Sequence, residues 1–259
     1  MLANWQSCYA GTISSRSTRG ETGVRTLREL ARSYMTTTKD LSRGRSRLKA
    51  LYRSRAIPSA GRDVYYTRHR NQWLGKIQHA GVRRRAQSLY QHLDRLKQLR
   101  QQVRRELLAQ GRQYQITSQL RRIPCIGPIR SVLLVALLQT PHRFRTKRPL
   151  WAYSGLALET RISAEYCYME GQRPGSKKLL SIRELNKDHN HDLKGLFKAA
   201  AITASARPGP LQDYQASLAK GIKPTMARLT LARKIAAITL TLWEKGEDFD
   251  AEKLKLQAA

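Results

Sequence analysis

Apolar residues recur at helical spacing along most of the chain, and arginine and lysine occupy the positions between them. Val24, Leu27, Leu30 and Tyr34 share one face of a helix that we predict from about residue 24 to residue 57. Proline and glycine residues after Ile57 end this pattern. A second helical stretch is predicted from about residue 67 to residue 109, so the first half of the chain consists mainly of basic helices.

A regular seam of apolar residues runs through the second helical stretch. Its members follow one another at alternating three- and four-residue steps, and Arg100 occupies one of the positions. This spacing is typical of a coiled coil of about three heptads, which would make the chain a homo-oligomer. It fits equally well one helix of an antiparallel hairpin formed with the preceding helix. The seam residues are Leu89, Leu93, Leu96, Val103 and Leu107.

The second half of the chain has one weakly helical region between helical parts. Residues 150–182 contain several glycines and a proline, and no alternating strand pattern is evident there. Helices are again predicted at 193–206 and 225–243. We therefore predict a mainly α fold in four parts. These are a disordered N-terminus (1–22), a basic helical linker with the coiled coil (23–118), a helical domain (119–246) and a polar tail (247–259).

The charge of the chain favours a polyanionic partner. It has 49 Lys and Arg residues against 18 Asp and Glu, a formal net charge of +31. Such an excess repels itself unless a polyanion neutralises it, which makes nucleic acid the expected partner and a membrane surface a weaker alternative. The N-terminal segment lacks the apolar block of a signal peptide, although its Arg- and Ser-rich composition is also typical of a transit peptide.

The cysteine and histidine residues give no sign of a disulfide framework or a metal site. The three cysteines, Cys8, Cys125 and Cys167, are far apart and form no CxxC pair. His189 and His191 are close together but have no further ligand pair nearby, so we interpret them as surface or polar-contact residues. A reducing, cytoplasmic setting fits this composition.

One segment carries the pattern of a DNA-binding turn. RRIPCIGPIRSVLLVALL, residues 121–138, places Ile-Pro-x-Ile-Gly-Pro between two predicted helices, as in a helix-hairpin-helix. The backbone N–H groups at the start of the second helix can bind a DNA phosphate, and Gly127 would let the backbone approach it closely. Arg121, Arg122 and Arg130 add positive charge. The alternative is a helix-helix turn that packs in a core without DNA.

Cys125 departs from the usual pattern of such a hairpin. It occupies a position where these turns usually have another glycine. A cysteine resists the positive φ angle that glycine tolerates, so a distorted turn is expected at this residue.

The hairpin and the blocks after it resemble a known family. HRFRTKRPLWAYSGLALE and LNKDHNHDLKGLFKAAA follow it in order, and together they are similar to the C-terminal domain of the insertion-sequence-110 (116/902 type) transposases. The resemblance covers residues 120–245, and the basic helices before it resemble the family's linker. In that family an aromatic-Gly-Leu turn precedes a Lys-x-Gly-Asn-x-x-Leu-Arg block. The matching residues here are Phe144, Tyr153, Gly155, Leu156, Lys187, Asn190 and Leu193, with Lys194 in place of the arginine and His189 in place of the glycine.

The resemblance implies a mobile-element recombinase with two domains. A RuvC-like nuclease domain would hold Mg²⁺ with four acidic ligands, and the C-terminal domain would carry a serine that attacks DNA. A structured guide RNA and an assembly of four chains are also implied. Counting from the Gly-Leu turn puts this serine at Ser163, with Ser176 beside Lys177 and Lys178 as the second choice. Lys187, Asn190 and Lys194 would contact backbone phosphates, although capping and solvation explain the same residues.

The acidic residues that a RuvC-like site needs are missing from the first half of the chain. Residues 1–122 contain few carboxylates, and none follows a recognisable strand. We therefore expect an N-terminally truncated transposase that binds no metal itself and does not catalyse transposition alone. The alternatives are a non-catalytic DNA- or RNA-binding remnant and a basic ribosome-associated or structural protein.

Overall fold

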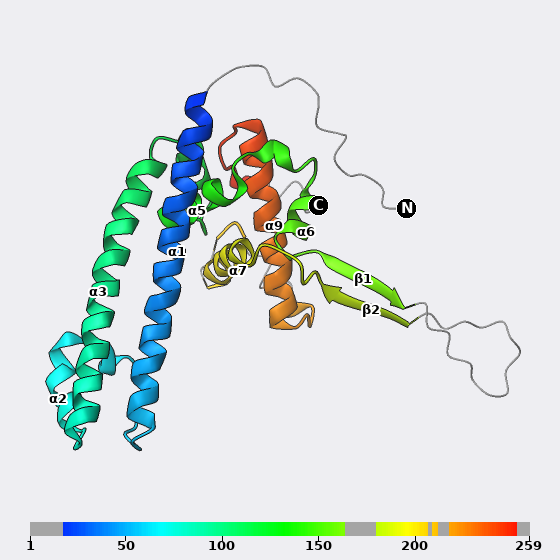
Figure 1. The fold of residues 1–259 in the computed structure, drawn as a ribbon. Helices are drawn as coiled ribbons and strands as arrows, with labels where there is room; N and C mark the ends of the chain where they lie inside the picture. The colour runs from blue at the N-terminus through cyan, green and yellow to red at the C-terminus, as the bar shows by residue number, and fades with distance from the viewer. Residues whose placement is uncertain (1–17, 164–179, 207–208, 212–217, 253–259) are drawn as a thin grey trace, which may run out of the picture.

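A hairpin of two long helices forms one side of the molecule. The computed structural model describes residues 18–163, 180–206, 209–211 and 218–252. Helices α1 (Thr18–Arg53) and α3 (Ala80–Gly111) run side by side in opposite directions (Figure 1). The predicted first helix is therefore confirmed, and it begins six residues earlier than its apolar pattern suggested, within the part expected to be disordered.

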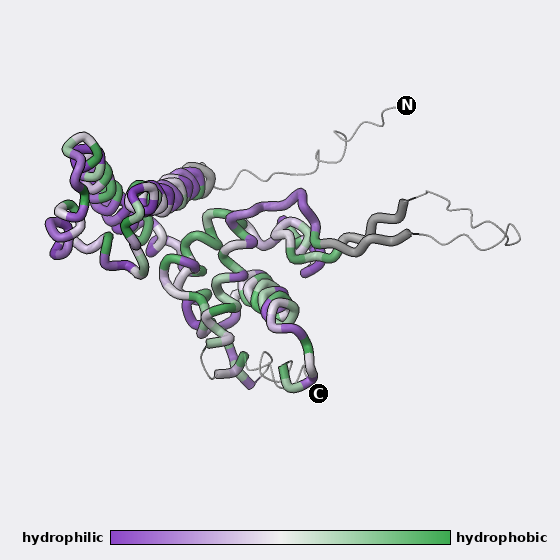
Figure 2. Tube along the Cα trace, turned by 90° about the horizontal axis from the view of Figure 1, so that it is seen from below, coloured by the Kyte–Doolittle hydropathy of each residue, from purple (hydrophilic) through white to green (hydrophobic). Residues whose placement is uncertain are grey.

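The apolar seam of α3 packs against α1 of the same chain. Leu93, Val103 and Leu107 are buried, and Gly44 of α1 allows a close approach to Leu93, since a Cβ at residue 44 would lie 2.9 Å from Leu93 Cδ2. Of the two interpretations of the heptad spacing, the antiparallel hairpin is the one that the fold adopts. Figure 2 shows hydrophilic and hydrophobic residues alternating along both helices, as expected for helices with one buried stripe.

Short helices close the far end of this hairpin. The predicted continuous helix from residue 67 is wrong in its first part, because the chain there forms η1 (Asp63–Tyr65), η2 (Thr67–His69) and α2 (Arg70–Gly75) before α3 begins. These turns cover a second small core in which the buried hydroxyl groups of Tyr52 and Tyr90 lie 3.1 Å apart. The two tyrosines satisfy each other's polar group inside an apolar cluster.

The remaining helices form a separate, larger core with the near ends of α1 and α3. Helices α5 and α9 each contribute more buried side chains to it than any other element, and Leu27 of α1 and Leu107 of α3 join it. The predicted helices at 193–206 and 225–243 are confirmed as α7 and α9. The elements of this helical part are α4 (Gln115–Leu120), α5 (Pro128–Leu138), η3 (Pro141–Arg143), α6 (Lys147–Tyr153), α7 (His191–Ser205) and α9 (Pro224–Lys245).

A two-stranded β arm projects from the helical part. Strands β1 (Leu158–Ser163) and β2 (Leu180–Leu185) pair antiparallel, with Leu158 opposite Leu185 and Ser163 opposite Leu180. Figure 1 shows the arm pointing away from the helices. The sequence showed no alternating strand pattern in residues 150–182 and so did not predict this arm, although the fold class remains mainly α. In the second strand, LSIREL, apolar and polar residues do not alternate strictly.

None of the helices in the described part of the chain combines the length and the apolar character needed to cross a bilayer.

Candidate nucleic-acid interface

The segment 121–127 forms the predicted turn between two helices. Cys125 and Ile126 are buried in the main core, and α5 begins directly after Gly127 with Pro128 in its first turn. Gly127 has φ −80° and ψ 176°, ordinary extended backbone, and a Cβ there would meet nothing within 4 Å. Among the described residues, Ala56 and Gln139 are the non-glycine residues with positive φ. Cys125 therefore causes no backbone distortion, and that expectation was wrong.

The three arginines of the turn differ in their surroundings. Arg121 and Arg122 are exposed, and Arg122 forms an ion pair with Asp248 after the end of α9. Arg130 is half-buried, and its Nη1 donates to the carbonyl of Cys125 at 2.9 Å and to Thr203 Oγ1 at 3.0 Å. Arg130 thus ties the turn to α7, while the other two guanidinium groups face solvent.

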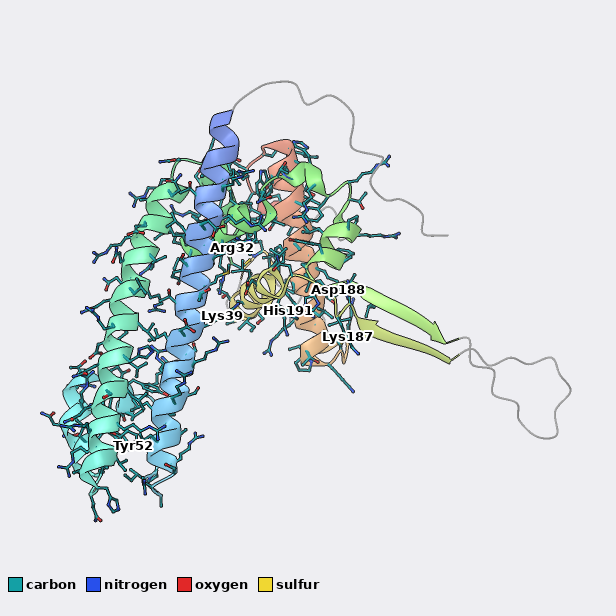
Figure 3. All side chains as sticks on the ribbon, in the orientation of Figure 1. Arg32, Lys39, Tyr52, Lys187, Asp188 and His191 are labelled. Carbon is teal, nitrogen blue, oxygen red and sulfur yellow. The ribbon has the colours of Figure 1, made fainter. Side chains whose placement is uncertain are left out.

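The start of α7 is built around Asn190. This residue is the N-cap: its Oδ1 accepts the backbone N–H of Leu193 at 3.0 Å, which satisfies one of the unpaired donors of the first turn. Asp192 follows in that turn and pairs with Lys39 of α1 at 2.7 Å. Asn190 therefore caps α7, as the alternative explanation of this residue predicted. The nitrogen of its side-chain amide remains available for a second contact. Figure 3 shows Lys39 on α1 and His191 at the start of α7.

That second contact is with Tyr153 at the end of α6. Asn190 Nδ2 lies 3.3 Å from Tyr153 Oη, and Arg143 Nη1 lies 3.4 Å from the same oxygen. The Arg143 guanidinium also lies 4.3 Å from the centre of the Tyr153 ring. Burial raises the pKa of Tyr153, but the hydrogen bonds from Asn190 and Arg143 and the charges of Arg143 and Arg28 outweigh burial and lower it.

Lysine residues add positive charge at the start of α7 and at the base of the arm. The Lys194 backbone N–H donates to the carbonyl of Asn190 at 3.0 Å, and burial together with Lys198 lowers the pKa of the Lys194 amine. Lys187 is exposed at the base of the arm (Figure 3). We call Arg28, Arg143, Tyr153, Asn190 and Lys194 the α7 cluster.

Gly155 of the Gly-Leu turn packs closely against His189. His189 stands at the position where the similar family has a glycine. Gly155 has φ +64°, and a Cβ there would overlap the ring of His189. His189 also lies against His191, with ring centres 4.3 Å apart. Burial, then Lys194 and His191, lower the pKa of His189, so this ring is neutral at a pH where an ordinary histidine is partly charged.

Ser163, the first choice for the nucleophile, lies on the β arm. Ser163 is the last residue of β1. Asn186 anchors the base of the arm to the end of α6, because its backbone N–H donates to Ala157 O at 3.3 Å and its Nδ2 to Ala152 O at 3.4 Å. Ser176, Lys177 and Lys178 lie outside the described residues.

The predicted phosphate-binding residues occupy opposite ends of α7. Arg130 of the turn contacts Thr203 near the C-terminal end of α7, whereas Asn190 and Lys194 lie at its start. Thirteen residues of helix separate Asn190 from Thr203, which corresponds to about 20 Å. Both ends belong to one core, so the two places are rigidly connected without forming a single site.

The described residues do not form the metal site that the family resemblance implies. No group of three or more His, Cys, Asp and Glu side chains within residues 18–163, 180–206, 209–211 and 218–252 is arranged to hold a metal ion. Several of the carboxylates that do occur here pair with arginine or lysine, as Asp192 and Asp248 do.

Three residues of the α7 cluster, Arg28, Arg143 and Tyr153, are absent from the nucleic-acid contacts predicted from the sequence. Arg143 lay only within the segment HRFRTKRPLWAYSGLALE, and Tyr153 only matched a residue of the aromatic-Gly-Leu turn. The signal that could have found Arg143 is the run RFRTKR, three arginines and a lysine within six residues. Arg28 comes from α1, more than a hundred positions away, and only tertiary packing brings its charge to Tyr153.

The fold and this interface define a basic, mainly helical protein with a turn of the helix-hairpin-helix type and a projecting β arm. Residues 117–215 match the Transposase IS116/IS110/IS902 family. The matched region, which covers less than half of the chain, is a C-terminal transposase domain of this family, a domain that acts in DNA transposition and recombination. A search among curated proteins finds none that matches the chain. The serine nucleophile and the truncation stay predictions.

Proposed function

We propose that the transposase domain binds DNA through its sugar–phosphate backbone along α7. The α7 cluster would contact one phosphate. The turn before α5, with Arg121 and Arg122, would contact another. The distance of about 20 Å between the two ends of α7 corresponds to about six nucleotides of one DNA strand at 3.4 Å each. The observation that carries this proposal is the convergence of α1, η3, α6 and α7 on one group of positive charges around Tyr153.

Ser163 is proposed as the residue that attacks DNA. Its oxygen would form a bond to phosphorus and displace a sugar oxygen, which leaves a phosphoserine link. A serine needs a base to take its proton and positive charge beside the phosphate. Support comes from the position of Ser163 on the β arm, whose base adjoins the α7 cluster. The six residues of β1 place Ser163 about 17 Å from the first residue of the strand. DNA bound at the cluster and lying along the arm would reach it.

The second candidate is DNA or RNA binding without catalysis. It is favoured by the absence of a metal-ligand group among the described residues, since the family's reaction uses one. This candidate also agrees with the expectation that the chain alone does not catalyse transposition. A structured guide RNA would bind the same kind of basic surface, because RNA presents the same backbone charge.

An oligomer is a further proposal that rests on the family resemblance. Because α1 covers the seam of α3, an interface through the coiled coil would use residues outside the seam, such as Leu99, which is 47% exposed. Light scattering of the purified chain and of Leu99→Lys tests this. A mass above one chain that falls in the variant supports the interface, and a single-chain mass for the native protein contradicts it.

A covalent-adduct assay separates the two candidate functions. The full chain, with Mg²⁺, is incubated with labelled element-end DNA, and protein–DNA adducts are separated under denaturing conditions. Ser163→Ala should abolish the adduct while DNA affinity is unchanged. Ser181→Ala, on the neighbouring strand opposite Ile162, is the matched control and should retain it. DNA binding without any adduct in the native protein would favour the non-catalytic candidate, and an adduct that persists in Ser163→Ala would exclude this serine.

A further inference from the structure

The hydroxyl of Tyr153 has two neighbours that can only donate to it. Asn190 Oδ1 is engaged with the backbone N–H of Leu193, so the atom that faces Tyr153 must be Nδ2. An amide nitrogen and a guanidinium carry hydrogens and no accepting lone pair. The Tyr153 oxygen therefore accepts from Asn190 at 3.3 Å and from Arg143 at 3.4 Å.

The proton of this hydroxyl must then point toward a third group. A phenol has one donor hydrogen, and neither Asn190 nor Arg143 can receive it. Within the part of the chain that the structure describes, the hydrogen bonds of Tyr153 Oη are those two. The side chain is only partly buried, so a ligand can approach its hydroxyl group.

The surroundings of the hydroxyl favour a negatively charged acceptor. Arg143 lies 4.3 Å from the ring, and Arg28 contributes a second charge from α1. Asp192, at the start of α7, is already paired with Lys39 at 2.7 Å, so its charge is compensated. The positive groups beside Tyr153 thus lack a carboxylate of their own in the described structure, and an anion with accepting oxygens would complete the site.

We propose that Tyr153 and Arg143, positioned by Asn190, form a binding site for one phosphate group of the DNA backbone. Tyr153 donates its proton to a non-bridging phosphate oxygen, and Arg143 supplies the opposite charge. The phosphate is bound and not attacked by Tyr153. This inference rests on the proposed DNA binding and assigns to it a particular hydroxyl donor. It differs from binding at the helix-hairpin-helix turn, which lies at the other end of α7.

The direct test is the ionisation of Tyr153 with and without DNA. Full-length chain is labelled with ¹³C at the tyrosine Cζ, and NMR follows each phenol as the pH rises. The signal of Tyr153 is the one lost in Tyr153→Phe. A bound phosphate favours the neutral phenol, so saturating duplex DNA should raise the pKa of Tyr153 above that of the free protein. The exposed Tyr66, at the far end of the α1–α3 hairpin, serves as the reference.

DNA affinity gives a second readout with matched variants. Tyr153→Phe keeps the ring and removes one hydrogen bond to a charged group, so duplex affinity should fall about tenfold. Because the phenol is neutral, the dependence of affinity on salt should stay the same. Arg143→Gln should lower both the affinity and the salt slope, the slope by about one. Tyr66→Phe should change neither.

The outcomes separate this inference from the function on which it rests. Duplex that binds with steep salt dependence while the pKa of Tyr153 stays unchanged would overturn the phosphate site and leave DNA binding intact. A chain that does not bind duplex at all would contradict the proposed function. If inorganic phosphate, at matched ionic strength, raises the pKa of Tyr153 but duplex DNA does not, the site binds small phosphates and the assignment to the DNA backbone is wrong.

Discussion

Asn190 Oδ1 accepts the backbone N–H of Leu193 at 3.0 Å, and this one hydrogen bond determines which atom of the amide faces Tyr153. The cap of α7 and the donor to the phenol are therefore two ends of the same side chain. A helix start that is defined by its cap also places a polar group of the α7 cluster.

Asn190→Asp should separate these two roles. Aspartate caps a helix as well as asparagine does, so the melting temperature should change little. Its carboxylate would replace the amide donor near Tyr153 with a negative charge, so the pKa of the phenol should rise. Asn190→Ala loses the cap and should cost about 1 kcal/mol of folding free energy. Urea unfolding and tyrosine NMR measure the two effects, and an Asn190→Ala protein as stable as the native one would contradict the capping role.

Gly155→Ala should destabilise the protein for two separable reasons. The backbone at residue 155 has φ +64°, which costs an L-residue about 1–2 kcal/mol, and the added methyl group would overlap the ring of His189. In a His189→Gly background only the backbone cost remains. We therefore expect Gly155→Ala to be less destabilising there, with a coupling above about 0.5 kcal/mol in a double-mutant cycle. Purely additive effects would show that the ring is not in the way.

The stability of the fold should fall between neutral and mildly acidic pH, in part because of His189. Its pKa in the folded chain lies below the ordinary histidine value of 6.5, so the unfolded chain binds a proton more readily in this range. Stability is then fully present above pH 6.5 and decreases as the pH falls toward the folded pKa. His189→Gln should flatten this dependence in urea unfolding at several pH values, and the exposed His142→Gln should not. An equal slope in the native protein and His189→Gln would exclude this contribution.

Asp248→Asn should strengthen DNA binding by the helix-hairpin-helix turn. Asp248 pairs with Arg122, one of the two solvent-facing arginines of the turn, and thereby competes with a phosphate for it. Both side chains are more than half exposed, so the pair itself contributes little to stability. We expect a severalfold gain in duplex affinity with an unchanged melting temperature. Asp63→Asn, in η1 at the far end of the hairpin, is the control for a general change of charge, and an equal gain in both variants would mean that the ion pair is irrelevant.

The helices could be predicted from the sequence because they are long and strongly periodic. The leucines of α7 and α9 and the Gly127–Pro128 start of α5 each give a local signal. The partner of the α3 seam could not be predicted, because the same heptad spacing serves a helix of the same chain or of another. The β arm was missed because the second strand, LSIREL, does not alternate apolar and polar residues strictly.

The candidate site could be predicted only in part. Asn190 and Lys194 stand in a family-like block and indeed lie in the α7 cluster. Tyr153 and Arg143 had no assigned role, because the contact of Tyr153 with Asn190 joins residues 37 positions apart. The distance between the helix-hairpin-helix turn and the block with Lys187 and Asn190 could not be predicted from the sequence. The structure places them at opposite ends of α7, since Arg130 contacts Thr203 near one end and Tyr153 contacts Asn190 at the other.

The salt dependence of duplex binding by a charge-deleted α7 cluster tests the central claim most directly. Affinity is measured between low and moderate salt for the native chain and for Arg28→Gln/Arg143→Gln/Lys194→Gln. If the α7 cluster binds backbone phosphates, the native chain should lose about 10³-fold in affinity or more between 50 and 200 mM salt, as expected for several phosphate contacts. The slope of the variant should be smaller by about two to three. Equal slopes in the two proteins would contradict DNA binding at the start of α7.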